Sequence, residues 1–186
     1  MESHFFKIIN EICKEEKIQI TNLSNDWILC LEKNGKTRFI SGYKFDCNPH
    51  ALGLIMDDKY ALYEVLKHKN IPVIEHNIVY KKDNKCDYAI GFNTDEYVEN
   101  LFNKYNNNVI LKPNAGTCGH SVYNIKKIGE LKEHLDFLFN SNFSVSICPN
   151  YNIKSEYRII MLNGKFHLIY KKVNPFVIGD GKKTIK

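Results

Sequence analysis

The chain has 186 residues, of which 44% are hydrophobic and 12% aromatic, so it can bury a core of its own and is not a disordered chain. Its formal net charge is +5, but the basic residues are nearly all lysines interleaved with acids, a composition that argues against a nucleic-acid partner. The six cysteines are widely separated and have no zinc-type spacing, which indicates free thiols in a reducing compartment.

A helix is predicted at the N-terminus, where apolar residues recur at helical spacing and Ser3 can act as the cap. Because Lys7, Asn10 and Glu11 interrupt these apolar residues, the segment is neither a signal-peptide core nor a membrane span. We therefore expect a soluble, cytoplasmic protein with no membrane partner.

Short strands follow this helix and complete a small N-terminal lobe, residues 1–56. Three runs have a β-like pattern, and Asn34-Gly35 between the last two predicts a hairpin turn. The three runs are residues 18–21, 27–31 and 37–40.

Residues 57–147 alternate between helical and strand patterns and are expected to form a second unit. Asp57 or Asp58 caps a helix that ends at Asn-Ile-Pro, residues 70–72, and Thr94 caps a second helix. The other predicted elements are strands at 74–79, 109–112, 122–124 and 143–148 and a helix at 128–139.

The last unit, residues 148–186, contains a predicted hairpin. Its strands are residues 156–162 and 165–171, and Asn163-Gly164 supplies the turn. Together with the preceding units, this order of helices and mainly antiparallel strands predicts an α+β fold.

The register of this hairpin makes a prediction about charge. With a two-residue turn, Glu156 lies opposite Lys171 and Arg158 lies opposite Ile169, all on one face. The three charged side chains would then cluster. A cross-strand ion pair on a solvated face is the alternative that the pattern leaves open.

Residues 109–122 carry the pattern that best suits a ligand. A strand ends in Lys112 and is followed by a loop that contains Gly116 and Gly119, whose backbone amides can wrap phosphate oxygens while the ammonium supplies positive charge. It is not a P-loop, because no Gly-Lys-Ser/Thr follows. An ordinary hairpin with a solvated lysine is the alternative.

The stretch from Lys112 to Val122, Lys-Pro-x-x-Gly-x-x-Gly-x-x-Val, resembles the phosphate loop of ATP-grasp ligases, especially those of the cyanophycin-synthetase and glutathione-synthetase-like branch. Three further stretches resemble the same family in the same order, and the resemblance covers about residues 57–186. They are Asp58-Lys59 with Ile71-Pro72-Val73, Glu156-Tyr157-Arg158 with Asn163-Gly164-Lys165, and Lys171-Lys172-Val173 with residues 177–185.

The resemblance implies an ATP-grasp-like fold with a small N-terminal lobe, a subdomain that carries the glycine loop, and only the first hairpin of the second nucleotide subdomain. Lys59 and Lys112 match the two lysines that contact ATP phosphates in that family. Gly116 and Gly119 match the flexible loop that closes over the phosphates. Ser121 stands where many relatives have a third glycine, which can stiffen the loop.

Further roles follow from the same resemblance. Residues 148–153 match the hinge where adenine is read by main-chain groups, so Asn150 and Asn152 are candidate nucleotide contacts. Pro149 departs from the family at this hinge, because relatives often have an acidic or amide side chain there.

On the hairpin, the resemblance implies that Glu156 contacts the ribose hydroxyls. Arg158 and Lys171 match basic residues that approach phosphate or the bound acyl group, and they are the candidate catalytic residues. A plain structural role on a solvated strand is the alternative for each.

The implied function is that of a carboxylate-amine ligase. Such a ligase transfers the γ-phosphate of ATP to a carboxylate, and an amine, here of an amino acid or peptide, then attacks the acyl phosphate. In the family, Mg²⁺ is held by acidic residues after the Gly-Asp-Gly segment, here residues 179–181. Because the sequence ends at Lys186, we expect either a fragment of a longer ligase or a shortened protein that has lost catalysis, in both cases without metal ligands and without turnover.

Two other hypotheses stay open at this point. The chain can be a non-catalytic nucleotide-binding module whose metal half is supplied elsewhere, or a basic interaction domain with no nucleotide site. The lysines and the glycine loop favour either nucleotide-binding hypothesis over the interaction domain. The missing acidic strands separate the ligase from the non-catalytic module.

Overall fold

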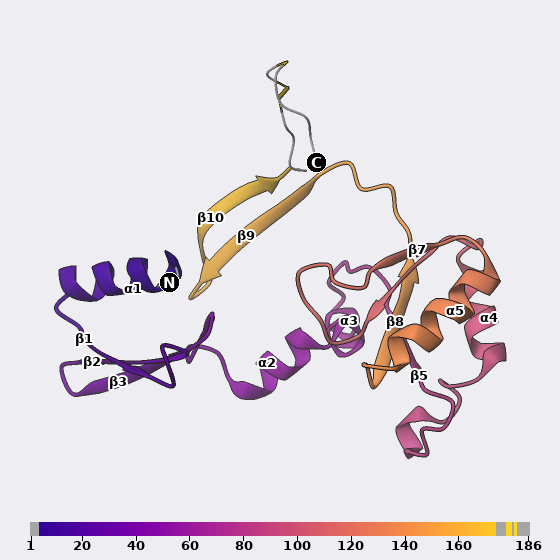
Figure 1. Cartoon of the computed structure of the whole chain (residues 1–186), viewed down its shortest axis with the longest axis horizontal. Helices are drawn as coiled ribbons and strands as arrows, with labels where there is room; N and C mark the ends of the chain where they lie inside the picture. The colour runs from indigo at the N-terminus through magenta and orange to yellow at the C-terminus, as the bar shows by residue number, and fades with distance from the viewer. Residues whose placement is uncertain (1–3, 174–177, 180, 182–186) are drawn as a thin grey trace.

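A computed structural model describes residues 4–173, 178–179 and 181 of the chain. Figure 1 shows an N-terminal lobe and a central subdomain at opposite ends of the molecule, with a two-stranded hairpin between them. Each of the three parts has a sheet of its own. No helix in the described ranges is long and apolar enough to cross a membrane.

The N-terminal lobe consists of helix α1 (His4–Glu15) and a four-stranded antiparallel sheet of order β1-β2-β3-β4. Its strands are β1 (Gln19–Leu23), β2 (Ile28–Lys33), β3 (Lys36–Ser41) and β4 (Lys44–Phe45). Cys13, Leu29 and Ile40 are its buried core residues. The predicted hairpin turn is confirmed: Asn34 and Gly35 have φ angles of 53° and 70°, the left-handed values that a two-residue turn requires.

Two helices connect this lobe to the central subdomain. Helix α2 (His50–Asp57) was not predicted from the sequence, and none of its residues is buried. Helix α3 (Lys59–His68) begins where the sequence indicated, because the Ala61 N–H donates to Asp58 Oδ1 at 2.8 Å.

The central subdomain has a four-stranded antiparallel sheet of order β5-β8-β6-β7 with helices α4 and α5 on one face. Its elements are β5 (Asn77–Tyr80), the 3₁₀ turn η1 (Asp87–Ala89), α4 (Asp95–Lys104), β6 (Val109–Pro113), β7 (Tyr123–Ile125), α5 (Ile128–Phe139) and β8 (Ser144–Pro149). The core between this sheet and the two helices consists of Val79, Val98, Leu101, Phe102, Val109, Leu111, Ile125, Leu131, Leu135, Leu138, Val145 and Ile147.

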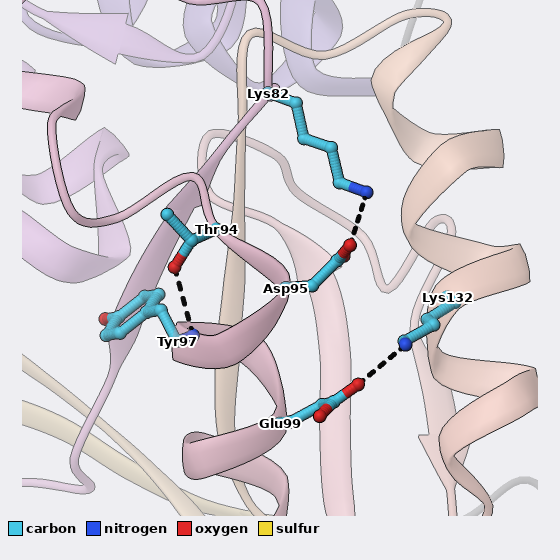
Figure 2. A network of polar contacts seen from close by, with 6 residues as sticks. All are labelled: Lys82, Thr94, Asp95, Tyr97, Glu99 and Lys132. Carbon is cyan, nitrogen blue, oxygen red and sulfur yellow. Dashed lines mark hydrogen bonds and ion pairs between the residues drawn. The ribbon is translucent and has the colours of Figure 1, made fainter.

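Helix α4 is fixed by its cap and by two ion pairs. The Tyr97 N–H donates to Thr94 Oγ1 at 3.1 Å, which confirms the predicted cap. Figure 2 shows Asp95 paired with Lys82, which follows β5, at 2.8 Å, and Glu99 paired with Lys132 of α5 at 2.7 Å. These pairs are solvent-exposed and contribute at most about 1 kcal/mol each, so the apolar core is the main stabilising contact between α4 and α5.

Strands β9 (Glu156–Leu162) and β10 (Lys165–Lys172) form the hairpin, and every residue in them is exposed. Leu162 pairs with Lys165 as predicted, but a β-bulge between Phe166 and Leu168 shifts the rest of the register by one residue.

The bulge corrects the predicted charge cluster. Glu156 lies opposite Lys172, not Lys171, and Arg158 lies opposite Tyr170. Because neighbouring residues of a strand point to opposite faces, Lys171 lies on the face away from Glu156. Lys172 replaces it and pairs with Glu156 at 2.6 Å.

The predicted division at residues 56/57 and 147/148 stays a prediction. The first boundary falls inside α2 and the second inside β8, whereas the three sheets occupy residues 19–45, 77–149 and 156–172.

Candidate functional site

The face of the central sheet opposite the apolar core is polar. Lys112 of β6 lies directly opposite Ser146 of β8, so the two side chains share this face with Cys148 two residues further on. Ser146 and Cys148 are buried, and Lys112 is half-buried. His76, which precedes β5, reaches the same group: its Nδ1 lies 2.8 Å from Ser146 Oγ.

These neighbours set the charge of the titratable groups. Burial, followed by the positive charges of Lys112 and Lys59, lowers the pKa of His76 from 6.5 to about 4, so the imidazole is uncharged at neutral pH. Burial raises the pKa of the Cys148 thiol, and the hydrogen bond and charge of Lys112 offset this only in part. The imidazole and the thiol of this face are therefore both uncharged at neutral pH.

Lys59, the first residue of α3, anchors the start of the glycine loop. Its Nζ donates to three backbone carbonyl oxygens, those of Pro113 at 2.9 Å, Asn114 at 3.0 Å and Gly116 at 3.1 Å. Burial and then the charge of Lys112 lower the pKa of Lys59, which indicates that the two ammonium groups are near each other. All three N–H donors of Lys59 thus hold the loop in place.

Asn114, which was not predicted as a site residue, also connects the loop to α3. It is 1% exposed; its Oδ1 accepts from the Tyr60 N–H at 3.1 Å, and its carbonyl oxygen accepts from the Lys59 N–H at 3.2 Å. Its own N–H donates to the Ser144 carbonyl at 3.2 Å. Through its side chain and its backbone, this one residue therefore ties α3 and β8 to the end of β6.

The rest of the loop requires unusual backbone angles. Cys118, Gly119 and Ser121 have φ angles of 59°, 72° and 55°, all in the left-handed region that favours glycine. Ser121, the residue expected to replace a third glycine, thus adopts the conformation that a glycine would adopt without strain. At Gly119 a methyl group would meet no neighbour, so this position is constrained only by φ.

A cavity of about 420 Å³ lies between this loop, the two lysines and the hairpin. It gathers five of the predicted site residues from three separate segments of the chain: Lys59, Lys112, Gly116, Gly119 and Glu156. Two cations, one carboxylate and a loop of backbone amides around one cavity suit a ligand that carries phosphate groups and hydroxyls.

Four other predicted site residues do not line this cavity. Asn150 is used in local structure: its side-chain Nδ2 donates to Asn108 Oδ1 and Asn124 Oδ1 at 3.1 Å, and its N–H donates to the Asn108 carbonyl at 3.1 Å. These contacts use the N–H donors of Asn150, so its backbone and side-chain carbonyl oxygens are what it can offer to a base. The other three, Asn152, Arg158 and Lys171, are exposed.

Comparison with known proteins shows likeness at the level of the fold. No protein-family model matches the chain, and no curated protein matches its sequence. Solved structures that are similar to the chain include two ligases. A D-alanine-D-alanine ligase from Coxiella burnetii is 15% identical with a TM-score of 0.53, and 64% of this chain and 34% of that one are covered. A D-alanyl-alanine synthetase A from Vibrio cholerae is 12% identical with a TM-score of 0.54, and 69% of this chain and 37% of that one are covered.

The chain has an ATP-grasp-like fold. At the level of the fold, the resemblance read from the sequence and the predicted α+β class are therefore confirmed. The chain spans about a third of the length of each of these ligases. Residues 177–185, which carry part of the sequence resemblance, lie mostly outside the described residues.

On this ATP-grasp-like fold, the polar sheet face contains residues that the sequence reasoning missed. His76 and Ser146 were not singled out, although β8 alternates between polar and apolar residues, Ser144-Val145-Ser146-Ile147-Cys148. This period of two indicates a strand that packs one face against an apolar core and turns the other face to a polar environment.

Proposed function

We propose that this chain binds ATP in the cavity between the glycine loop and the hairpin. The single observation that carries the proposal is the convergence of Lys59, Lys112, both loop glycines and Glu156 on one cavity. The ammonium of Lys112 and the loop amides would face the phosphates, and Glu156 would accept hydrogen bonds from the ribose hydroxyls. Lys59, which already holds the loop, would act on the phosphates through its charge.

Titration calorimetry with ATP, ADP, AMP and adenosine tests this proposal. Because the cavity offers cations to the phosphate chain, we expect saturable binding of ATP and ADP, weaker binding of AMP, and none of adenosine at equal concentrations. The affinity should fall as salt is raised, since part of the site is open to solvent. Folded protein that binds none of the four at millimolar concentration would refute the proposal.

We further propose that this nucleotide site belongs to a carboxylate-amine ligase of the cytoplasm, where ATP is available. In such a reaction a carboxylate oxygen attacks the γ-phosphorus of ATP, ADP leaves, and the amine of an amino acid or peptide then attacks the acyl carbon and displaces phosphate. The fold supports this reading, because the similar solved structures are ligases that join alanine units by name.

Arg158 is the basic residue that would approach the acyl phosphate, because it shares the hairpin face of Glu156. Lys171 lies on the other face, so a role for it requires a ligand or a further segment on that side. Ligases of this fold use Mg²⁺. The described residues contain no group of three Asp, Glu, His or Cys side chains that could hold a metal ion, and we assign no metal ligand among them.

The ligase proposal is tested by measuring the rate of ADP release from ATP with and without added amino acids and dipeptides. Amine-dependent ADP release that falls in an Arg158→Ala variant would support it and would refute the expectation from the sequence that this chain has no turnover. Arg38→Ala of the N-terminal lobe is the matched control. ATP binding without any amine-dependent turnover would favour the non-catalytic module instead.

A further inference from the structure

His76 has no role in the nucleotide binding proposed above. Its Nδ1 contacts the fully buried Ser146 hydroxyl at 2.8 Å, and Ser146 is the direct cross-strand partner of Lys112. The imidazole therefore contacts the cross-strand neighbour of the residue expected to hold the phosphates.

The groups that face His76 come from three elements. Lys112 on β6 and Lys59 on α3 supply two positive charges, and Ser146 and Cys148 on β8 supply neutral groups. Glu75, its neighbour in sequence, is turned to Lys104 and pairs with it. The positive charges of Lys112 and Lys59 therefore disfavour protonation of His76.

The Ser146 hydroxyl can accommodate either protonation state of the ring. A hydroxyl donates to an unprotonated imidazole nitrogen and accepts from a protonated one, because its hydrogen can rotate. The contact with His76 therefore survives a change of charge without movement of the strands. A methyl or carbonyl group at this place would not allow that.

We propose that His76 is a proton-accepting residue of the nucleotide site, which takes up a proton when phosphate groups bind beside Lys112 and Lys59. The inference rests on the proposed nucleotide binding and deepens it. Bound phosphates bring negative charge next to both ammonium groups, so the repulsion that keeps a proton off the ring is offset. Nucleotide affinity then increases as the pH falls from neutral toward 5.

Calorimetric titration with ADP at pH 5, repeated in buffers of different ionisation enthalpy, measures the protons taken up per ADP bound. If ADP raises the pKa of His76 from about 4 by one unit, wild-type protein takes up about 0.4 proton more than a His76→Asn variant. Asn retains a polar partner for Ser146, and His68→Gln, at the exposed end of α3, is the matched control. Protonation of the ADP phosphates themselves is common to all three proteins and cancels.

Carbon-proton NMR of the imidazoles in wild-type protein gives the same answer without a substitution. A His76 signal that titrates near pH 4 without ADP and at least one pH unit higher with saturating ADP supports the proposal. Saturable ADP binding with equal proton uptake in wild type and His76→Asn, or an unmoved His76 titration, overturns it and leaves nucleotide binding intact. No ADP binding overturns both proposals.

Discussion

Replacement of Lys112 by alanine tests the nucleotide site most directly. The three N–H donors of Lys59 are taken up by backbone carbonyls, so Lys112 is the cation left to donate to phosphate oxygens. A hydrogen bond to a charged group is worth about 1.5 to 3 kcal/mol, so Lys112→Ala should weaken ATP binding about tenfold to a hundredfold. Lys112→Arg should not rescue fully, because the planar guanidinium needs more room than the half-buried site gives.

The assay is titration calorimetry with ATP, accompanied by thermal unfolding of each variant. Lys126→Ala is the control, because Lys126 is exposed beyond the end of β7 and should leave the affinity unchanged. A second readout is independent of ligand: loss of the Lys112 charge should raise the pKa of His76 from about 4. An affinity within about twofold of wild type, in a Lys112→Ala variant that unfolds normally, would refute the assignment of the phosphate loop.

Three further predictions concern the surroundings of the site. Lys59→Met should lower the free energy of unfolding by about 1 to 3 kcal/mol and weaken ATP binding, because the loop loses its anchor. Urea unfolding and calorimetry on the same samples measure the two quantities, and the prediction is wrong if neither the stability nor the affinity changes. Ser121→Gly should stabilise the protein by up to about 1 kcal/mol in thermal unfolding because φ is 55°, whereas Ser141→Gly should not. Because the pKa of His76 is about 4 when folded and 6.5 when unfolded, the unfolded chain binds more protons between these values, and stability falls as the pH drops from 6.5 to 4. The full difference corresponds to about 3 kcal/mol, reduced to about 2 by partial exposure, and urea unfolding of His76→Asn should show a smaller loss over that range.

Local signals in the sequence predicted local structure well. The Thr94 cap, the Asp58 cap and the turns at Asn34-Gly35 and Asn163-Gly164 each depend on residues within four positions of one another, and all are present. Strand β4 and helix α2 were not predicted. Strand β4 has two residues, too few to show a periodic pattern, and α2 is a short helix of eight residues, none of which is buried.

Register beyond a turn depends on events that no local pattern records. Counting back from Asn163-Gly164 gave the correct first pair, but the bulge between Phe166 and Leu168 adds one residue to β10. Because side chains alternate with a period of two, that one residue moves Lys171 to the other face and brings Lys172 to Glu156. The nature of the charged pair was thus predictable, but the identity of the lysine was not.

The two lysines of the site show why a sequence pattern alone cannot assign their roles. By resemblance Lys59 and Lys112 are equivalent phosphate contacts, yet Lys59 donates to carbonyls 54 to 57 residues away, a contact that exists only once α3 packs against the loop. Lys112, in contrast, lies on the central strand β6 beside the buried Ser146 and Cys148, and its charge shifts the pKa of His76, Cys148 and Lys59. One cation therefore shapes the loop while the other sets the electrostatic potential of the cavity, so neutralising Lys59 should act first on stability and neutralising Lys112 first on affinity.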